Sequence, residues 1–169
     1  MADTVDQHRA GAPQQVGCAV LTVSDTRTLQ DDRGGQRLVE LLESEGHRIA
    51  DRHITPDEPA QIHMLVVQLA QRDDVDAILL TGGTGISQRD QTYETVTALL
   101  TKSLTGYGEL FRQLSYAQIG PAAMLSRAVG GLCGSTVVLT MPGSPAAIEL
   151  AMREIILPEL GHLVREARK

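Results

Sequence analysis

The chain has 169 residues, which suits one domain with its own hydrophobic core and is short for two. Hydrophobic residues make up 42% and charged residues 21%, as is typical of globular proteins rather than disordered ones. The net charge of −6 provides no overall field that would attract DNA, RNA or an anionic membrane. An anionic ligand would therefore need local donors, such as backbone N–H groups and helix N-termini.

Residue usage disfavours two further kinds of site. The chain has no Trp, one Phe and three Tyr, too few rings for stacking the bases of single-stranded nucleic acid. Cys18 and Cys133 lie in apolar surroundings, form no CxxC pair and, with five scattered histidines, show no zinc-ligand spacing. We interpret both cysteines as buried free thiols of a protein in the reducing cytoplasm.

Residues 1–15 are polar and contain no apolar run of the kind that a signal sequence needs. No stretch approaches the roughly 18 apolar residues of a membrane-spanning helix. We therefore predict a flexible N-terminal tail over residues 1–15 and a single domain over residues 16–169. The protein is expected to be soluble and cytoplasmic, with no membrane or nucleic acid partner.

Short apolar runs alternate with amphipathic segments along the chain. The apolar runs predict buried strands, over residues 16–23, 77–81 and 136–141. A strand at a sheet edge is expected over residues 47–54, and glycines predict a turn or hairpin over residues 130–134. The amphipathic segments predict helices, over residues 35–45, 59–69, 92–100, 109–117, 121–127, 145–156 and after Pro158. Between them, Gly106-Tyr107-Gly108 is expected to break the chain.

Strands that alternate with helices at this spacing indicate βαβ units. We therefore predict an α/β fold, a single three-layer domain with a mostly parallel sheet and helices on both faces. Ligands of such sheets bind beyond the carboxyl ends of the strands. Polar loops leave three predicted strand ends and are expected to meet at one rim, at residues 24–26, 82–90 and 142–145.

The strongest local signal is the sequence TGGTG at residues 81–85. Its glycines allow positive φ angles and close backbone approach, so that successive N–H groups can surround a phosphate, and Thr84 adds a hydroxyl donor. The loop is not a Walker A sequence, and Gln88 stands in place of the third glycine of GxGxxG. A tight turn after a strand is the alternative interpretation, and the glycines alone support it about equally.

Two aspartates accompany these loops. Asp90 precedes a predicted helix, where it or Thr92 can act as the N-cap, and Asp57 precedes Glu58-Pro59, which makes it a natural N-cap. Either carboxylate can instead hold Mg²⁺ on a nucleotide, because Mg²⁺ prefers carboxylate and phosphate oxygens. Capping is the commoner role for an aspartate placed like Asp57, and one carboxylate can fill both roles.

The remaining polar loop residues are weaker signals. Ser24 and Asp25 follow the first predicted strand, where a simple turn is the alternative. Arg127 suits a phosphate because its planar guanidinium donates two parallel hydrogen bonds, although a satisfied surface pair with Ser126 is equally consistent. The sequence Pro-Gly-Ser at residues 142–144 begins a predicted helix after a strand, which is a ready anion site but also a common turn.

Together these segments resemble the MoaB/MogA family of molybdenum cofactor biosynthesis proteins, from about Val16 to the last helix. The strongest match is TGGTGISQRDQTYE at residues 81–94. Shorter matches occur in the same order, at residues 21–25, 56–58, 123–128 and 141–144. Residues 108–116 and Tyr93 are closer to the MoaB branch, because the MogA branch usually has Pro in place of this Tyr.

The resemblance implies binding of molybdopterin, a phosphorylated pterin with a dithiolene. In active relatives its terminal phosphate attacks the α-phosphate of Mg-ATP, pyrophosphate leaves, and adenylylated molybdopterin forms. By this likeness Asp57 and Asp90 are the catalytic pair that positions Mg²⁺ and ATP. The likeness also implies substrate-binding residues at the three loops and beside them: Gly82, Gly83, Thr84, Gly85, Ser24, Asp25, Ser126, Arg127, Pro142, Gly143 and Ser144.

Two other functions stay open. A non-catalytic paralogue or scaffold would bind molybdopterin without consuming ATP. A nucleotide hydrolase similar to the N-terminal domain of competence-damage-inducible proteins would share the fold, but the helix predicted over residues 109–117 disfavours it. The resemblance further implies a homo-oligomer, either a trimer or a hexamer, and contact with other enzymes of the cofactor pathway.

Overall fold

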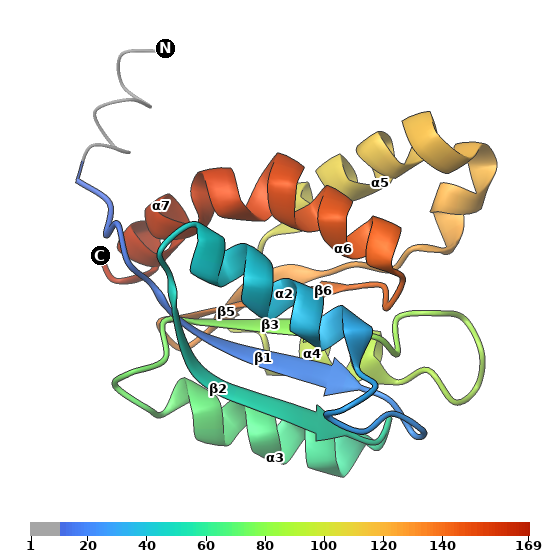
Figure 1. Cartoon of the computed structure of the whole chain (residues 1–169), viewed down its shortest axis with the longest axis horizontal. Coiled ribbons are helices and arrows are strands. Elements are labelled where there is room, and N and C mark those ends of the chain that lie inside the picture. Colours follow the sequence, from blue (N-terminus) through green and yellow to red (C-terminus); the bar gives the residue numbers. More distant parts are fainter. Residues whose placement is uncertain (1–10) are drawn as a thin grey trace.

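The computed structural model describes residues 11–169 and contains one six-stranded sheet between two layers of helices (Figure 1). The strands are β1 Gly17–Val23, β2 Arg48–Thr55, β3 Ala77–Thr81, β4 Lys102–Ser103, β5 Gly130–Cys133 and β6 Thr136–Met141. The helical segments are α2 Arg33–Ser44, α3 Pro59–Ala70, α4 Thr92–Leu99, α5 Thr105–Ile119, η1 Gly120–Leu125, α6 Pro145–Ala151, η2 Met152–Ile156 and α7 Leu157–Ala167.

The sheet has the order β2-β1-β3-β6-β5-β4 and is mostly parallel. β1 pairs in parallel with β2 and β3, and β3 with β6, whereas β5 is antiparallel to both of its neighbours. The predicted α/β fold is therefore confirmed, as are the edge position of β2 and the hairpin of β5 and β6. In the register, Thr81 lies beside Thr22 on one side and Met141 on the other, so three strands end at one rim.

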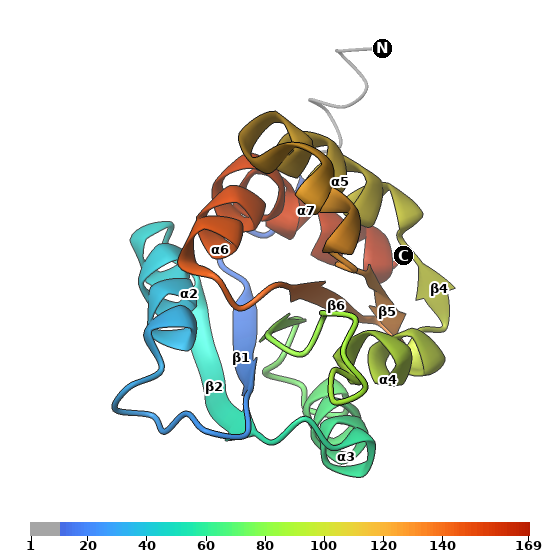
Figure 2. The ribbon, with the colours of Figure 1, turned by 90° about the vertical axis from the view of Figure 1, so that its right-hand side faces the viewer.

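Helices cover both faces of the sheet (Figure 2), and an apolar cluster fills the space on each face. On one face, alternate residues of β1 such as Val20 pack with α2, α5, α6 and α7. On the other face, the intervening residues such as Leu21 pack with Ile62 of α3 and Val96 of α4. Every residue of β1, β3 and β6 is buried, as expected of central strands covered on both faces.

The break predicted at Gly106-Tyr107-Gly108 is wrong, because α5 begins at Thr105 and runs through it. Tyr107 is buried, and its hydroxyl donates to the carbonyl oxygen of Thr140 at 2.9 Å. A Cβ at Gly108 would lie 2.6 Å from the carbonyl oxygen of Ala128, so the missing side chain lets the helix pack closely. These contacts outweigh the low helix propensity of glycine, which costs about 1 kcal/mol per residue.

Other boundaries also differ from the predictions. The helices expected on either side of Pro158 form one continuous segment, in which the π-helical turn η2 directly precedes α7. In that turn the N–H of Leu157 reaches back to the carbonyl of Met152, which widens the helix just before the proline. The short helix expected over residues 121–127 is a 3₁₀ helix, and the two-residue strand β4 was not predicted.

The predicted tail of residues 1–15 lies outside the described residues as far as residue 10. Residues 12–14 border a surface hollow beside α7, and the boundary at residue 16 stays a prediction. Cys18 is buried as predicted, whereas Cys133 is half-buried. Among residues 11–169, no helix is long and apolar enough to cross a membrane.

Candidate functional site

Three loops meet where β1, β3 and β6 end, as the fold class predicted, and Figure 2 views this rim. The N–H of Gly82 donates to the carbonyl of Met141 at 3.1 Å, and the hydroxyl of Thr81 donates to the carbonyl of Pro142 at 3.2 Å. On the other side, the N–H of Ser24 donates to the carbonyl of Thr55 at 2.9 Å. The loops are therefore tied to one another and to the sheet.

Only glycine fits at two positions of the Gly-rich loop, which comprises residues 82–90. Gly82 and Gly83 have φ angles of 98° and 63°, in the left-handed region that L side chains rarely adopt. A Cβ at Gly82 would lie 2.3 Å from the carbonyl oxygen of Val23. A Cβ at Gly83 would lie 2.2 Å from Oδ2 of Asp57, so this glycine brings the backbone against a carboxylate.

Backbone N–H groups of the same loop are left free. Within residues 11–169, the N–H groups of Gly83, Thr84, Gly85 and Ile86 have no hydrogen-bond partner. Successive free amides in a glycine-rich turn form a concave site for an anion such as phosphate. The loop thus has the donor chemistry that the sequence predicted, whereas a simple turn would need only the conformational freedom of its glycines.

Asp57 does not cap α3, which corrects the role favoured from its position. The N-cap is Glu58, and no side chain caps the helix. Instead Oδ1 of Asp57 accepts a hydrogen bond from the N–H of Gln91 at 3.0 Å. The residue is 5% exposed, and burial, together with the nearby charge of Asp90, raises the pKa of its carboxyl group. Asp57 therefore joins the loop after β2 to the end of the Gly-rich loop.

Asp90 and Thr92 do not cap α4 either, because its N-cap is Gln91, whose side chain accepts no capping hydrogen bond from the described part of the chain. Oδ2 of Asp90 instead accepts from the N–H and the hydroxyl of Ser87, at 3.0 and 2.6 Å. The same oxygen would lie 2.7 Å from a Cβ at Gly85. Asp90 therefore closes the Gly-rich loop on itself. The buried hydroxyl of Thr92 has no hydrogen-bond partner among residues 11–169.

Arg89, in the Gly-rich loop, joins the loops that follow β1 and β2, a role that its sequence position did not reveal. Its Nε and Nη2 donate to the two oxygens of Asp25, each at 2.7 Å, and Nη1 donates to Glu58 at 2.7 Å. Oδ1 of Asp25 in turn accepts from the N–H of Asp57 at 3.1 Å. The hydrogen bonds from Arg89 lower the pKa of Asp25 to about 2. A ring of contacts thus fixes the backbone that carries Asp57.

The two predicted substrate-binding residues Ser126 and Arg127 lie in different surroundings. The Oγ of Ser126 is buried and has no hydrogen-bond partner in the part of the chain that the structure describes, and the residue lines a cavity beside the Gly-rich loop. Arg127 does not line that cavity. Its guanidinium binds carbonyl oxygens of the loop and the carboxylate of Glu94, and it lies 5.0 Å from the centre of the Tyr93 ring.

Two cavities adjoin at the rim, and Gly82 and Gly143 line both. The first, of about 410 Å³, lies between the β1–α2 loop and the start of α6, and includes the predicted Ser24. The second, of about 450 Å³, lies between the Gly-rich loop, the end of α5 and residues 142–144. Ser144, besides lining the second cavity, caps α6 by accepting the N–H of Ala147 at 3.2 Å.

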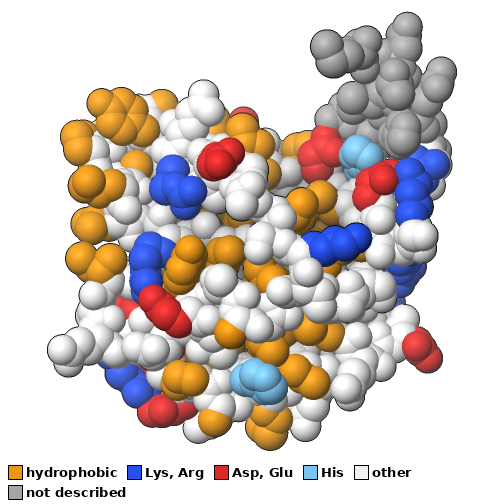
Figure 3. Space-filling view, turned by 180° about the vertical axis from the view of Figure 1, so that it is seen from behind, with side chains coloured by type: hydrophobic (Ala, Val, Ile, Leu, Met, Phe, Trp, Pro, Cys, Tyr) orange, Lys and Arg blue, Asp and Glu red, His pale blue; other side chains and the backbone are white. Residues whose placement is uncertain are grey.

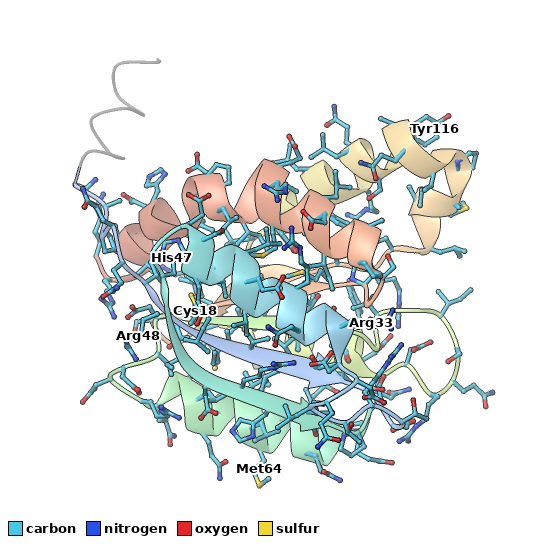
Figure 4. The ribbon with its side chains drawn as sticks, viewed as in Figure 1. Cys18, Arg33, His47, Arg48, Met64 and Tyr116 are labelled. Carbon is cyan, nitrogen blue, oxygen red and sulfur yellow. The ribbon has the colours of Figure 1, made fainter. Side chains whose placement is uncertain are left out.

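Several cavity residues escaped the sequence prediction. Arg27, Asp31 and Arg33 line the first cavity, and Figure 4 shows Arg33 at the start of α2 near the rim. The sequence Asp-Asp before Arg-Gly-Gly, at residues 31–35, could have predicted the start of a helix here. Asp32 caps α2, because its side chain accepts a hydrogen bond from the N–H of Gly35 at 2.9 Å. The apolar wall of the second cavity, from Phe111 to Leu125, had no comparable signal because it depends on how α5 packs.

No group of three or more His, Cys, Asp or Glu side chains within residues 11–169 is arranged to hold a metal ion. This arrangement suits Mg²⁺ only together with a substrate, because Mg²⁺ is often bound by one or two carboxylates and substrate phosphates. Asp57, whose Oδ2 faces Gly83, and Asp90, which lines the second cavity, are the carboxylates next to the free amides.

Fold and site together define a three-layer α/β protein with a Gly-rich loop of free backbone N–H groups and two adjoining cavities at the carboxyl rim of its sheet. A family model described as "Probable molybdopterin binding domain" matches residues 19–162. Molybdenum cofactor biosynthesis protein B of Bacillus cereus is 48% identical over 167 residues, 98% of this chain and 99% of that protein. The chain therefore belongs to the molybdenum cofactor biosynthesis family.

Solved structures agree with this assignment. A crystal structure of a molybdenum cofactor biosynthesis protein B has a TM-score of 0.90 and 49% identity, and the match covers 93% of this chain and 98% of that one. The tungsten cofactor synthesizing protein MoaB of Pyrococcus furiosus has a TM-score of 0.83 and 33% identity, with 94% and 100% covered. The family resemblance inferred from the motifs is confirmed, including the likeness to the MoaB branch.

Proposed function

We propose that the chain binds molybdopterin and adenylylates it with Mg-ATP, as a nucleotidyltransferase of molybdenum cofactor biosynthesis. The observation that carries this proposal is the pair of cavities that share Gly82 and Gly143. Two substrates bound in them would meet beside the free amides of the Gly-rich loop. Family membership supports the pterin as one substrate, and the anion-binding chemistry of the loop supports a phosphate at the meeting point.

The proposed reaction is a transfer at phosphorus. A terminal phosphate oxygen of molybdopterin forms a bond to the α-phosphorus of ATP, and the bond from that phosphorus to the bridging oxygen of the β-phosphate breaks. The electron pair leaves with pyrophosphate. Transfers of this kind require positioning and charge neutralisation more than a protein nucleophile. The four free N–H groups of the loop supply fixed donors without any change of side-chain charge.

Asp57 and Asp90 take the metal-binding role in this mechanism. Their carboxylates would hold Mg²⁺ against the phosphates, and the ion would supply neutralisation of the charge that develops on the leaving pyrophosphate. Asp57 is suited to the task because its second oxygen is not needed for the hydrogen bond from Gln91. The Arg89–Asp25 ring would keep this carboxylate in place while substrates exchange.

We also propose that the chain assembles as a homo-oligomer, a trimer or a hexamer, and contacts other enzymes of the pathway. Hydrophobic side chains gather along one edge of the molecule in Figure 3. Large apolar side chains are exposed on α5 and η1: Leu110, Tyr116, Ile119, Met124 and Leu125. Sedimentation equilibrium of the wild type and of Met124→Asp tests the assembly, which the substitution is expected to weaken.

Pyrophosphate release tests the reaction directly. Mg-ATP is supplied with and without purified molybdopterin to the wild type, Asp57→Asn and Asp90→Asn. Asp74→Asn is the control, because the carboxylate of Asp74 pairs with Arg72 outside both cavities. We expect pterin-dependent release from the wild type and the control, and at least a hundredfold less from the two site variants. Tight molybdopterin binding without release by the wild type would instead indicate a non-catalytic binding protein.

A further inference from the structure

Arg127 follows η1 and lies against the Gly-rich loop, with its side chain 24% exposed. Its Nε donates to the carbonyl oxygen of Thr84 at 3.2 Å, and its Nη2 makes a short hydrogen bond to the carbonyl oxygen of Gly85. Nη2 also lies 3.5 Å from the carbonyl oxygen of Asp90. One guanidinium thus gathers three backbone carbonyls of the loop.

These contacts determine where the neighbouring amides point. In a trans peptide the C=O of one residue and the N–H of the next point in opposite directions, and residues 11–169 contain no cis peptide bond. Because the carbonyls of Thr84 and Gly85 face Arg127, the N–H groups of Gly85 and Ile86 must face away from it. Both belong to the set of free donors that makes the loop an anion site.

Arg127 is itself held from the side of α4. Nη1 makes a short ion-paired hydrogen bond to Glu94, and Nη2 lies 3.4 Å from the second oxygen of the same carboxylate. The ring of Tyr93 lies 5.0 Å from the guanidinium carbon, within the range of a cation–π contact. Both partners lie in the first turn of α4, which also reaches the loop through the hydrogen bond from Thr92 to Gly83.

The donors of Arg127 are almost fully used. A guanidinium has five N–H groups, and the contacts to Thr84, Gly85, Asp90 and Glu94 occupy Nε, Nη2 and at least one N–H of Nη1. The residue also does not line either rim cavity. Direct recognition of a substrate phosphate would require these bonds to break, so the geometry disfavours the substrate-binding role implied by the family likeness.

We infer that Arg127 is a positioning residue, which turns the carbonyls of Thr84 and Gly85 away from the site so that the following amides face the substrate phosphate. Glu94 and Tyr93 hold the guanidinium in the position from which it contacts the loop. This inference rests on the proposed function in one respect, the identity of the anion, because it takes the loop amides to bind a phosphate of ATP or molybdopterin.

Four variants separate positioning from general stabilisation. Arg127→Met keeps the length of the side chain but removes every donor, and Arg127→Lys keeps the charge but cannot span two carbonyls. Glu94→Gln weakens the anchor of the guanidinium while leaving its contacts to the loop. Arg153→Met is the matched control, because it removes an exposed arginine that pairs with Glu149 on α6.

Two measurements are made on each folded variant: backbone amide order parameters from NMR relaxation, and the Kd for Mg-ATP from calorimetry. For Arg127→Met we expect the order parameters of Gly85 and Ile86 to fall from about 0.85 to below 0.6, with the sheet unchanged. We expect the Kd to rise at least tenfold. Arg127→Lys should be intermediate, Glu94→Gln should change the Kd less than threefold, and Arg153→Met should match the wild type.

Two results would overturn the inference: an unchanged loop order in Arg127→Met, or a loosened loop with an unchanged Kd. A purely stabilising role would lower the melting temperature and leave the loop order of the folded protein intact. If Arg127→Met does not fold, Arg127→Lys decides by the same two readouts. If the wild type binds no Mg-ATP and releases no pyrophosphate, the proposed function fails, and the order parameters alone decide whether Arg127 positions the loop.

Discussion

Two glycine clusters in this chain have similar sequences but differ in backbone conformation and hydrogen bonding. In the Gly-rich loop, Gly82 and Gly83 have positive φ angles, and their neighbouring amides remain free. In the β5–β6 hairpin, Gly130 and Gly131 lie in a strand whose backbone is hydrogen-bonded on both sides. A Cβ at Gly131 would lie 2.2 Å from the carbonyl oxygen of Lys102, so this glycine is needed for close packing.

The difference shows what glycine contributes in each place. The hairpin uses small size and turning ability to complete the sheet, so its glycines serve stability. The loop uses the same properties to leave donors unpaired beside two carboxylates, so under the proposed function its glycines serve binding at some expense of stability. Substitutions in the two clusters should therefore have different effects. Those in the Gly-rich loop should weaken binding, and those in the hairpin should lower the free energy of unfolding.

The largest effect is expected for Gly83→Ala. The new Cβ would lie 2.1 Å from Oγ1 of Thr92 and 2.2 Å from Oδ2 of Asp57, at a φ angle of 63°. Both the carboxylate and the loop must move, and we expect Mg-ATP binding to weaken at least a hundredfold in calorimetry. Gly46→Ala is the control, because φ is 81° there and a Cβ would meet nothing within 4 Å. Equal binding by both variants would contradict the prediction.

Gly131→Ala should instead change stability. Its Cβ would meet backbone at 2.2 Å and the side chain of Leu100 at 2.7 Å, which overpacks the junction of β4 and β5. Overpacking of this kind costs about 1–3 kcal/mol. Urea denaturation should show this loss, and the Kd of the folded variant for Mg-ATP should equal that of the wild type. A tenfold weaker Kd would mean that the hairpin also shapes the site.

Gly134→Ala should have a smaller effect on stability than Gly131→Ala. Gly134 turns the hairpin at a φ angle of 62°, but a Cβ there would meet nothing within 4 Å. The only cost is then the left-handed backbone conformation of the alanine, about 1–2 kcal/mol. Urea midpoints of the two alanine variants, measured side by side, test the order. If Gly134→Ala is the less stable, backbone conformation outweighs close packing in this cluster.

The smallest expected effect is a dependence of stability on pH at the first cluster. Burial raises the pKa of Asp57, so its contribution to stability is present below the usual pKa of an aspartate and is lost as pH rises through the raised value. At pH 7 the ionised carboxylate therefore destabilises the fold. Asp57→Asn should unfold at a slightly higher urea concentration than the wild type at pH 7, with a difference that vanishes at acid pH.

The pH dependence of stability should have the opposite sign for Asp25, which serves as the comparison. Arg89 lowers its pKa from 3.8 to about 2, so its contribution is present above 3.8 and is lost as pH falls through about 2. Asp25→Asn should therefore be less stable than the wild type at pH 7 and converge with it near pH 2. If both asparagine variants shift in the same direction at pH 7, the burial of Asp57 is not the cause.

Much of the fold followed from local pattern. Buried strands such as β3 are continuous apolar runs, and their alternation with helices predicts parallel pairing without any knowledge of contacts. The start of α5 did not follow, because Gly106 and Gly108 favour a break, which the burial of Tyr107 and the close contact of Gly108 with Ala128 outweigh. The two-residue strand β4 is too short to leave a pattern, and it exists only because β5 offers it a partner.

The candidate site divides in the same way. Its loops were predictable, because glycines, hydroxyl groups and carboxylates at strand ends are visible in the sequence and parallel strands place their ends together. The roles of single side chains were not. From its position alone Asp57 was expected to cap a helix, but it accepts a hydrogen bond from Gln91, directly after the Gly-rich loop. Arg127 was expected beside a substrate and binds backbone carbonyls.

Local pattern was enough to predict the order of the elements, the parallel sheet and the rim where the polar loops meet, because periodicity and turn chemistry act over a few residues. The partners of the charged side chains, in contrast, depend on the packing of distant segments. Arg89 and Asp25 are 64 residues apart, and Arg127 and Thr84 are 43 apart. A guanidinium binds whichever acceptors the packed chain brings within about 3 Å, and no local propensity encodes that choice.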